Sequence, residues 1–147
     1  MKRLGQFLLV VALVGLVPEG ASAQERKLIA PLRGEVTLDI TKPNTKLVGG
    51  VVVTEIIVHN PSTTGAIAGL KVEENWYDKA RNPVAGDTYR HPRPLKAGEV
   101  VVITLRTPKI AAMQSNQYQF SHGNGTIKTN IVPKIDVPKV DAPKATK

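Results

Sequence analysis

The chain contains no cysteine among its 147 residues. This absence excludes disulfide bonds, thiol catalysis and zinc sites built from cysteine thiolates. An exported domain without disulfides has to be held together by core packing alone. Such domains are more typical of the bacterial envelope than of animal extracellular fluids. Aromatic residues are also scarce, at 4%. Because single-stranded nucleic acids are commonly bound by stacking their bases on aromatic rings, nucleic acid is not an expected partner.

Motifs for catalysis and cofactor binding are missing as well. None of the four serines stands in the G-x-S-x-G motif of a hydrolase nucleophile. The glycine-rich stretches 49–50 and 123–125 lack the lysine and the following helix of a phosphate-binding loop, so they are expected to be turns. We therefore predict a protein that is not an enzyme and that uses no cofactor.

Residues 1–23 have the features of a secretory signal peptide. Lys2 and Arg3 are followed by an almost wholly apolar run, and residues 21–23 (ASA) offer small side chains at the positions that signal peptidase recognises. The apolar run is short for a bilayer core of about 30 Å. Cleavage after Ala23 is predicted, with retention as a membrane anchor as the alternative. The protein is thus expected to be exported to the periplasm or the extracellular space, and not to be transmembrane after cleavage.

Basic residues outnumber acidic ones, 20 to 12, which gives a formal net charge of +8. Removal of the signal peptide takes away Lys2, Arg3 and Glu19, which leaves 18 basic and 11 acidic residues and a net charge of +7. Such a balance favours anionic partners. The expected partners are an envelope protein, an anionic envelope polymer or a lipid surface.

Alternating apolar and polar residues predict seven β-strands, with no helical periodicity between them. The expected strands are residues 35–40, 51–60, 66–77, 84–91, 99–107, 117–121 and 126–131. Short strands with turn signals every 8–12 residues or so are typical of an immunoglobulin-like sandwich, and Tyr118 stands where such a fold often has a corner tyrosine. We predict this sandwich for residues 35–132, after an extended lead-in at 24–34. A small closed barrel is the structural alternative, and edge strands leave self-association open.

The stretch 70–78 (LKVEENWYD) is expected to lie at the centre of the sandwich. Leu70, Val72 and Trp76 alternate with polar residues, and Trp76, which can bury on the order of 200 Å², is predicted to be a core residue. Glu74 has the same strand parity and would also point inward. A β-bulge that returns its carboxylate to solvent is the favoured interpretation, with a functional buried acid as the alternative.

The middle of the chain resembles the FxLYD family of exported bacterial domains and, more distantly, the LEA14-like sandwiches. The resemblance rests on residues 51–62 (VVVTEIIVHNPS), 70–72 (LKV) and 76–78 (WYD, in place of Leu-Tyr-Asp). It continues in residues 95–99 (LKAGE), where alanine replaces the usual proline of a Leu-x-Pro-Gly-Glu turn. The resemblance covers residues 48–107 and implies a sandwich fold and an envelope location. It carries no catalytic residues onto this chain.

Three histidines are candidates for a metal site. His59 ends the second expected strand, His91 the fourth, and His122 follows the sixth. Because even-numbered strands of an up-and-down sandwich run the same way, all three should lie at one end of the domain. Imidazoles within reach of one another would suit zinc or copper, which makes a metal-handling protein the alternative function. Separate loop histidines are the simpler interpretation, because a shared end is not a shared point.

After Val132 the sequence becomes a repeat with a period of five: VPKID, VPKVD, APKAT. Proline in each repeat blocks helix and ladder alike, so residues 133–147 are expected to be extended and disordered. Four lysines are candidates for contact with an anionic surface: Lys134, Lys139, Lys144 and Lys147. We therefore expect a non-enzymatic exported binding or structural module of the cell envelope with a basic tail. A bare disordered end is the alternative for the tail.

Overall fold

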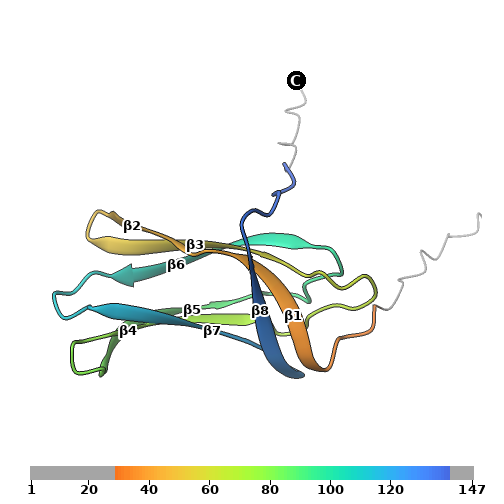
Figure 1. Ribbon diagram of the computed structural model, residues 1–147, viewed down its shortest axis with the longest axis horizontal. Helices are drawn as coiled ribbons and strands as arrows, with labels where there is room; N and C mark the ends of the chain where they lie inside the picture. The colour runs from red at the N-terminus through yellow and green to blue at the C-terminus, as the bar shows by residue number, and fades with distance from the viewer. Residues whose placement is uncertain (1–28, 140–147) are drawn as a thin grey trace, which may run out of the picture.

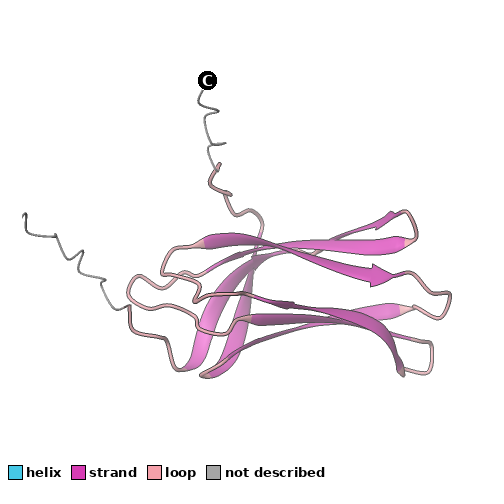
Figure 2. Ribbon diagram, turned by 180° about the vertical axis from the view of Figure 1, so that it is seen from behind, coloured by secondary structure: helices cyan, strands magenta, loops and turns pink. Residues whose placement is uncertain are grey.

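The computed structural model describes residues 29–139, and these residues form an all-β domain without helices (Figure 2). Eight strands follow one another along the chain: β1 (Gly34–Thr41), β2 (Asn44–Val48), β3 (Val51–His59), β4 (Lys71–Tyr77), β5 (Pro83–Arg90), β6 (Val100–Pro108), β7 (Ser115–His122) and β8 (Gly125–Val132). Within the described range, no helix is long and apolar enough to cross a membrane.

The strands form one continuous, curled sheet that folds into two facing layers (Figure 1). One layer has β3 between β2 and β6, paired antiparallel with both. The other has β4 between β5 and β7, again antiparallel. β1 and β8 cross between the layers, because β1 pairs with β3 only at Asp39 and Ile40 and with β8 along its whole length. The result is a sandwich with a strand pair closing one side.

The pairing of β1 with β8 is parallel and joins the two ends of the domain. At its start the two backbones approach so closely that a side chain on Gly125 would collide with the carbonyl group of Gly34. The Gly34 amide donates to the Asn124 carbonyl at 3.0 Å, and His122 Nε2 lies 2.9 Å from the Gly34 carbonyl oxygen. Glycine at position 125 is therefore required by close packing as well as by the turn.

The core is a cluster of aliphatic side chains between the layers. Inward-facing positions alternate along β1, β3, β4 and β6, as expected for a sheet with one buried face. The fully or almost fully buried members are Leu38, Ile56, Val58, Ile67, Leu70, Val72, Leu95, Ile103 and Leu105. Tyr89, Tyr118 and Phe120 pack against this cluster and are partly buried. Burial of this aliphatic surface is the main source of stability, at about 25 cal/mol per Å².

The prediction of an all-β sandwich is confirmed, but the prediction of seven strands is wrong. The additional strand, β2, has every residue exposed, so it shows none of the alternation from which the other strands were identified. The expected strand at 66–77 is also shorter, because residues 66 and 67 form only isolated bridges, to Pro31 and Leu95. The signal peptide and the last part of the tail lie outside the described residues.

Trp76 is not at the centre of the core as predicted. It is only partly buried and does not belong to the core cluster, whereas Leu70 and Val72 of the same stretch do. Its indole Nε1 is buried without an acceptor among the described residues. The physical reason is its position one residue before the end of β4, on the far side of Glu74 from the aliphatic cluster. The stretch 70–78 still contributes the central strand of its layer, since β4 is paired with β5 on one edge and with β7 on the other.

Candidate functional site

Glu74 on β4 is fully buried, and its carboxylate accepts hydrogen bonds from both layers. From the facing layer, Thr54 Oγ1 donates to Oε1 at 2.8 Å and Thr107 Oγ1 donates to Oε2 at 3.0 Å. From its own layer, Tyr118 Oη donates to Oε1 at 3.1 Å, and Asn116 Nδ2 lies 3.5 Å from the same oxygen. Three donors thus surround Oε1 and one contacts Oε2.

Further hydrogen bonds extend this group into a network, which we call the Glu74 cluster: Thr45, Thr54, Glu74, Thr107, Asn116 and Tyr118. Asn116 Nδ2 donates to Tyr118 Oη at 2.7 Å, and the hydroxyl oxygens of Thr45 and Thr54 are 3.1 Å apart. Burial raises the pKa of the Tyr118 hydroxyl. The hydrogen bond to Thr45 lowers this pKa, and the negative charge of Glu74 raises it. The tyrosine therefore remains a hydrogen-bond donor throughout the neutral pH range.

The expected bulge that would return Glu74 to solvent does not occur at this residue. The register shift in β4 lies between Trp76 and Tyr77, after Glu74, so the carboxylate keeps the inward parity of Val72. A buried carboxylate is stable because four donors replace its hydration. The cluster connects the two layers. We interpret it as a structural cross-link.

The three histidines lie toward the same end of the sandwich, since β3, β5 and β7 run in the same direction. Each has its own local partner. His59 Nδ1 is 3.1 Å from Asp39 Oδ2, and His91 Nδ1 is 2.8 Å from the hydroxyl of Tyr89. His122 uses both ring nitrogens, because Nε2 contacts the Gly34 carbonyl and Nδ1 accepts from the Asn124 amide at 3.3 Å.

These separate partners leave the metal hypothesis without support from side-chain geometry. Among residues 29–139, no three His, Cys, Asp or Glu side chains are arranged to hold a metal ion. Burial lowers the pKa of His91, and the positive charge of Arg93 lowers it further, while the negative charge of Glu99 acts in the opposite direction. Its neutral form is thus favoured in the folded protein.

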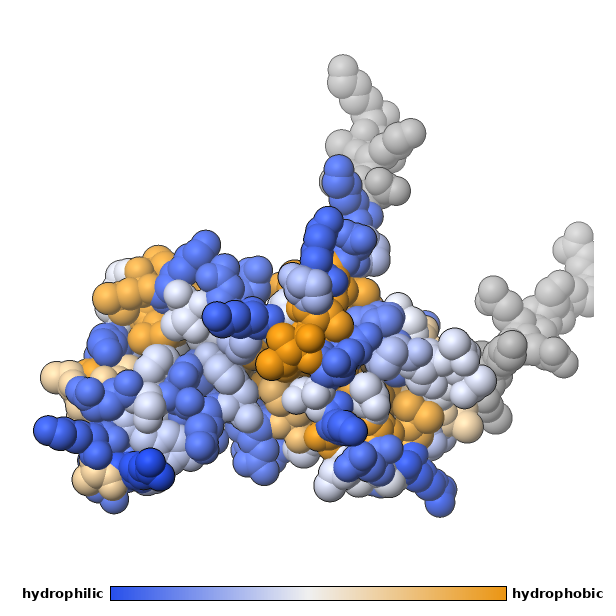
Figure 3. Space-filling view, in the orientation of Figure 1, coloured by the Kyte–Doolittle hydropathy of each residue, from blue (hydrophilic) through white to orange (hydrophobic). Residues whose placement is uncertain are grey.

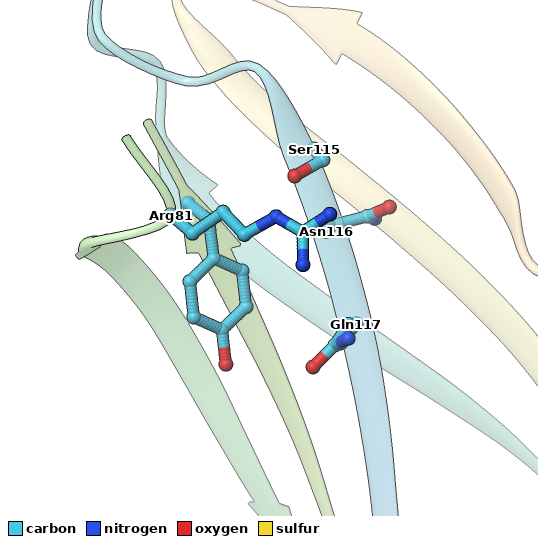
Figure 4. Close-up of a pocket in the computed structure, with 5 residues that line it drawn as sticks. Arg81, Ser115, Asn116 and Gln117 are labelled. Carbon is cyan, nitrogen blue, oxygen red and sulfur yellow. The ribbon is translucent and has the colours of Figure 1, made fainter. Parts of the chain in front are cut away.

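A shallow hollow of about 400 Å³ lies at the opposite end of the sandwich, where the β4–β5 turn meets the start of β7 (Figure 4). Its lining comprises Tyr77, Arg81, Ser115, Asn116 and Gln117. The Arg81 side chain extends from the turn toward β7, and Arg81 is the one non-glycine residue with positive φ (66°) in the described part of the chain. The hollow could accept a small anion or a hydroxyl-rich group. Sequence reasoning missed it, because residues 78–83 stand between two expected strands and carry no binding motif.

The tail lysines are described in part. Residues 133–139 leave the end of β8 without joining either layer, and Lys134 and Lys139 are exposed (Figure 1). Lys134 Nζ is 2.9 Å from Asp136 Oδ1, in a pair whose side chains are 81% and 89% exposed. An ion pair this exposed to water contributes little to the stability of the fold. Lys144 and Lys147 lie outside the described residues.

Comparison with known proteins gives little to add to this geometry. No family model matches the chain, and no curated protein matches it. Among solved structures, the chain is similar to IrmA from Escherichia coli, with a TM-score of 0.46 and 9% sequence identity. The similarity covers 69% of this chain and 97% of IrmA. It is too low to support an argument about fold or function, and the FxLYD resemblance stays a prediction.

Proposed function

We propose that the protein is a non-enzymatic binding or structural module of the bacterial cell envelope, exported to the periplasm or the extracellular space. Its basic tail contacts an anionic surface, which is an anionic polymer, a lipid surface or an acidic face of an envelope protein. The observation that carries the proposal is the course of residues 133–139, which leave the sandwich and expose Lys134 and Lys139. Exposed lysines beyond the end of β8 are accessible to a partner.

The arrangement of charges in the tail predicts weak and salt-sensitive attachment. In an extended chain that advances about 3.1 Å per residue, lysines five residues apart are separated by about 15 Å. That spacing exceeds the Debye length of about 8 Å at physiological salt, so each lysine acts nearly independently. Asp136 offsets part of the charge locally. The tail is therefore suited to holding the module near a surface rather than to binding one high-affinity ligand.

The test is deletion of residues 133–147 in protein purified after export, with the N-terminus identified by mass spectrometry so that retained residues 1–23 do not contribute. We expect binding to anionic vesicles and to cell-wall preparations to fall at low salt, with an unchanged melting temperature. A matched variant replaces the lysines at 134, 139, 144 and 147 with glutamine at constant tail length. Unchanged binding in both variants would show that the tail is not a tether.

A further inference from the structure

The outer face of the β2–β3–β6 layer is unusually apolar for an exposed sheet face. On β3, Thr54 and Ile56 are buried against the core, so Val53 and Ile57 point outward, where they are only partly covered. On β6, Val102 stands beside Ile57 and is 38% exposed. A strand that is apolar on both faces is expected only where both faces are covered.

This apolar face continues to the end of the sandwich at two adjacent loops. Just before the β2–β3 turn, the last two residues of β2 are exposed: Val48 (58%) lies on this face, and Leu47 (63%) lies on the reverse side of the strand, because it pairs with the buried Val52. The β6–β7 loop presents Ile110, which is 39% exposed, and the Lys109 amide donates to the Gly50 carbonyl at 2.9 Å, which fixes the loops side by side. Figure 3 shows the apolar surface where β2 ends. We call the three aliphatic side chains, Leu47, Val48 and Ile110, the apolar tip.

The charges around this face are mainly positive. Lys46 and Arg106 flank Val53 on neighbouring strands at one register position. Residues 42–54 and 100–116 contain four basic side chains and no acidic one: Lys42, Lys46, Arg106 and Lys109. Glu55 is the exposed acid on the face, and Asp87 accepts from the Arg106 amide at the outer edge of β6. The face therefore combines exposed aliphatic groups with an excess of positive charge.

The tail leaves the domain on this same side. Its first residues, Lys134 to Asp136, border a hollow with His59 at the end of β3 and Val100 at the start of β6. From there residues 133–139 run away from the β2–β3–β6 layer in both views (Figures 1 and 2). The tail lysines and the apolar face can thus meet one surface together.

We propose that the outer face of the β2–β3–β6 layer, led by the apolar tip, docks on an anionic lipid bilayer. The inference rests on the proposed function and specifies its anionic surface as lipid. Exposed aliphatic side chains gain from burial at the headgroup boundary, and each nearby lysine or arginine is attracted to anionic headgroups. A soluble polyanion would use the charges but leave the aliphatic groups in water. A second copy would bring positive faces together.

The experiment compares vesicles of phosphatidylcholine with and without phosphatidylglycerol in a sedimentation assay, with dextran sulfate as a soluble polyanion. The test variant is Leu47→Ser, Val48→Ser, Ile110→Ser with the tail intact. The matched control is Ile131→Ser, because Ile131 is 67% exposed on β8, outside this face. Melting curves confirm that each variant is folded, which is expected because all four side chains are exposed.

We expect the test variant to lose about tenfold or more in affinity for the anionic vesicles, because burial of only two CH₂ groups contributes a tenfold gain in affinity. Its binding to dextran sulfate should be unchanged, and the control variant should bind the vesicles as the wild type does. Equal binding of test variant and wild type to vesicles would overturn the docking face. A change in oligomeric state as the sole effect of the variant would overturn it too, in favour of a second copy. After either of these two outcomes, loss of vesicle binding on deletion of the tail would still support the proposed function.

Discussion

The interior of the sandwich has two halves that are stabilised by different interactions. Toward the histidine end, the layers meet through aliphatic side chains such as Val58, Leu70 and Ile103, which are fully or almost fully buried. Toward the other end, the same strands contribute the Glu74 cluster, in which a buried carboxylate receives donors from both layers. The aliphatic half depends on non-directional burial, and the polar half on hydrogen bonds with fixed geometry.

The difference shows how strand register can be fixed in a chain without disulfides. Aliphatic side chains at alternate positions pack nearly as well after a shift of two residues, because the inward parity is preserved. The same shift would place Val52 or Ile56 of β3 where Thr54 now donates to Glu74, and the buried carboxylate would lose that donor from the facing layer. We expect the aliphatic half to supply most of the stability and the polar half to select the alignment of the layers.

The largest effect is expected in the aliphatic half. Leu70→Ala should lower the free energy of unfolding by about 2–5 kcal/mol, since it removes a fully packed side chain and leaves a cavity. Urea denaturation followed by circular dichroism would measure this loss. Ile131→Ala provides the control, and its exposed position predicts a change within about 0.5 kcal/mol. Similar losses for the two variants would remove the aliphatic cluster from the centre of the fold.

Glu74 variants should have the next largest effect. Glu74→Leu leaves the Thr107 hydroxyl without an acceptor and the Thr54 hydroxyl with only that of Thr45, and a cost of about 1–3 kcal/mol is expected for each buried group left unsatisfied. Glu74→Gln should cost less, because the amide keeps one acceptor oxygen. In the triple variant with Thr54→Val and Thr107→Val, most of the loss should be recovered, as apolar replacements of buried polar groups can be nearly neutral. Additive losses across the three positions would contradict the cross-link.

A smaller change is expected at Trp76, beyond the polar half. Trp76→Phe should cost about 1 kcal/mol, because the side chain is only partly buried and the variant removes a buried N–H that has no acceptor among the described residues. The native emission spectrum should lie between that of a core tryptophan and that of free indole. A loss as large as that of Leu70→Ala, measured in the same urea titration, would place Trp76 in the core after all.

The smallest effect concerns pH. Because burial lowers the pKa of His91 in the folded protein, the unfolded chain binds more protons once the pH falls below about 6.5. The free energy of unfolding should therefore decrease on acidification through this range, and it should level off below the folded pKa. In His91→Gln this part of the pH dependence should be absent. Identical slopes for wild type and variant between about pH 7 and pH 5 would exclude His91 as the cause.

Sequence reasoning identified the fold class because alternation is a direct consequence of one buried face, as in β3 and β6. It missed β2, whose residues are all exposed and show no pattern. It correctly gave Glu74 an inward parity, but then moved the carboxylate to solvent. The donors that stabilise it come from Thr54, Thr107 and Tyr118, on three other strands, and no local pattern reveals which distant residues will lie opposite. The same limit applies to the histidines, since strand direction places them at one end but not at one point.

The parallel pairing of the first and last strands has a consequence for the kinetics of folding. Gly34 pairs with Gly125 and Thr41 with Val132, so the contacts that close the sandwich have a high contact order. Loop closure over such a separation makes folding slow compared with a helical bundle of similar size. A nascent chain in which residues 125–132 have not yet been synthesised cannot form the pairing of β1 with β8. We therefore expect the domain to fold cooperatively only after its C-terminal strand has been synthesised.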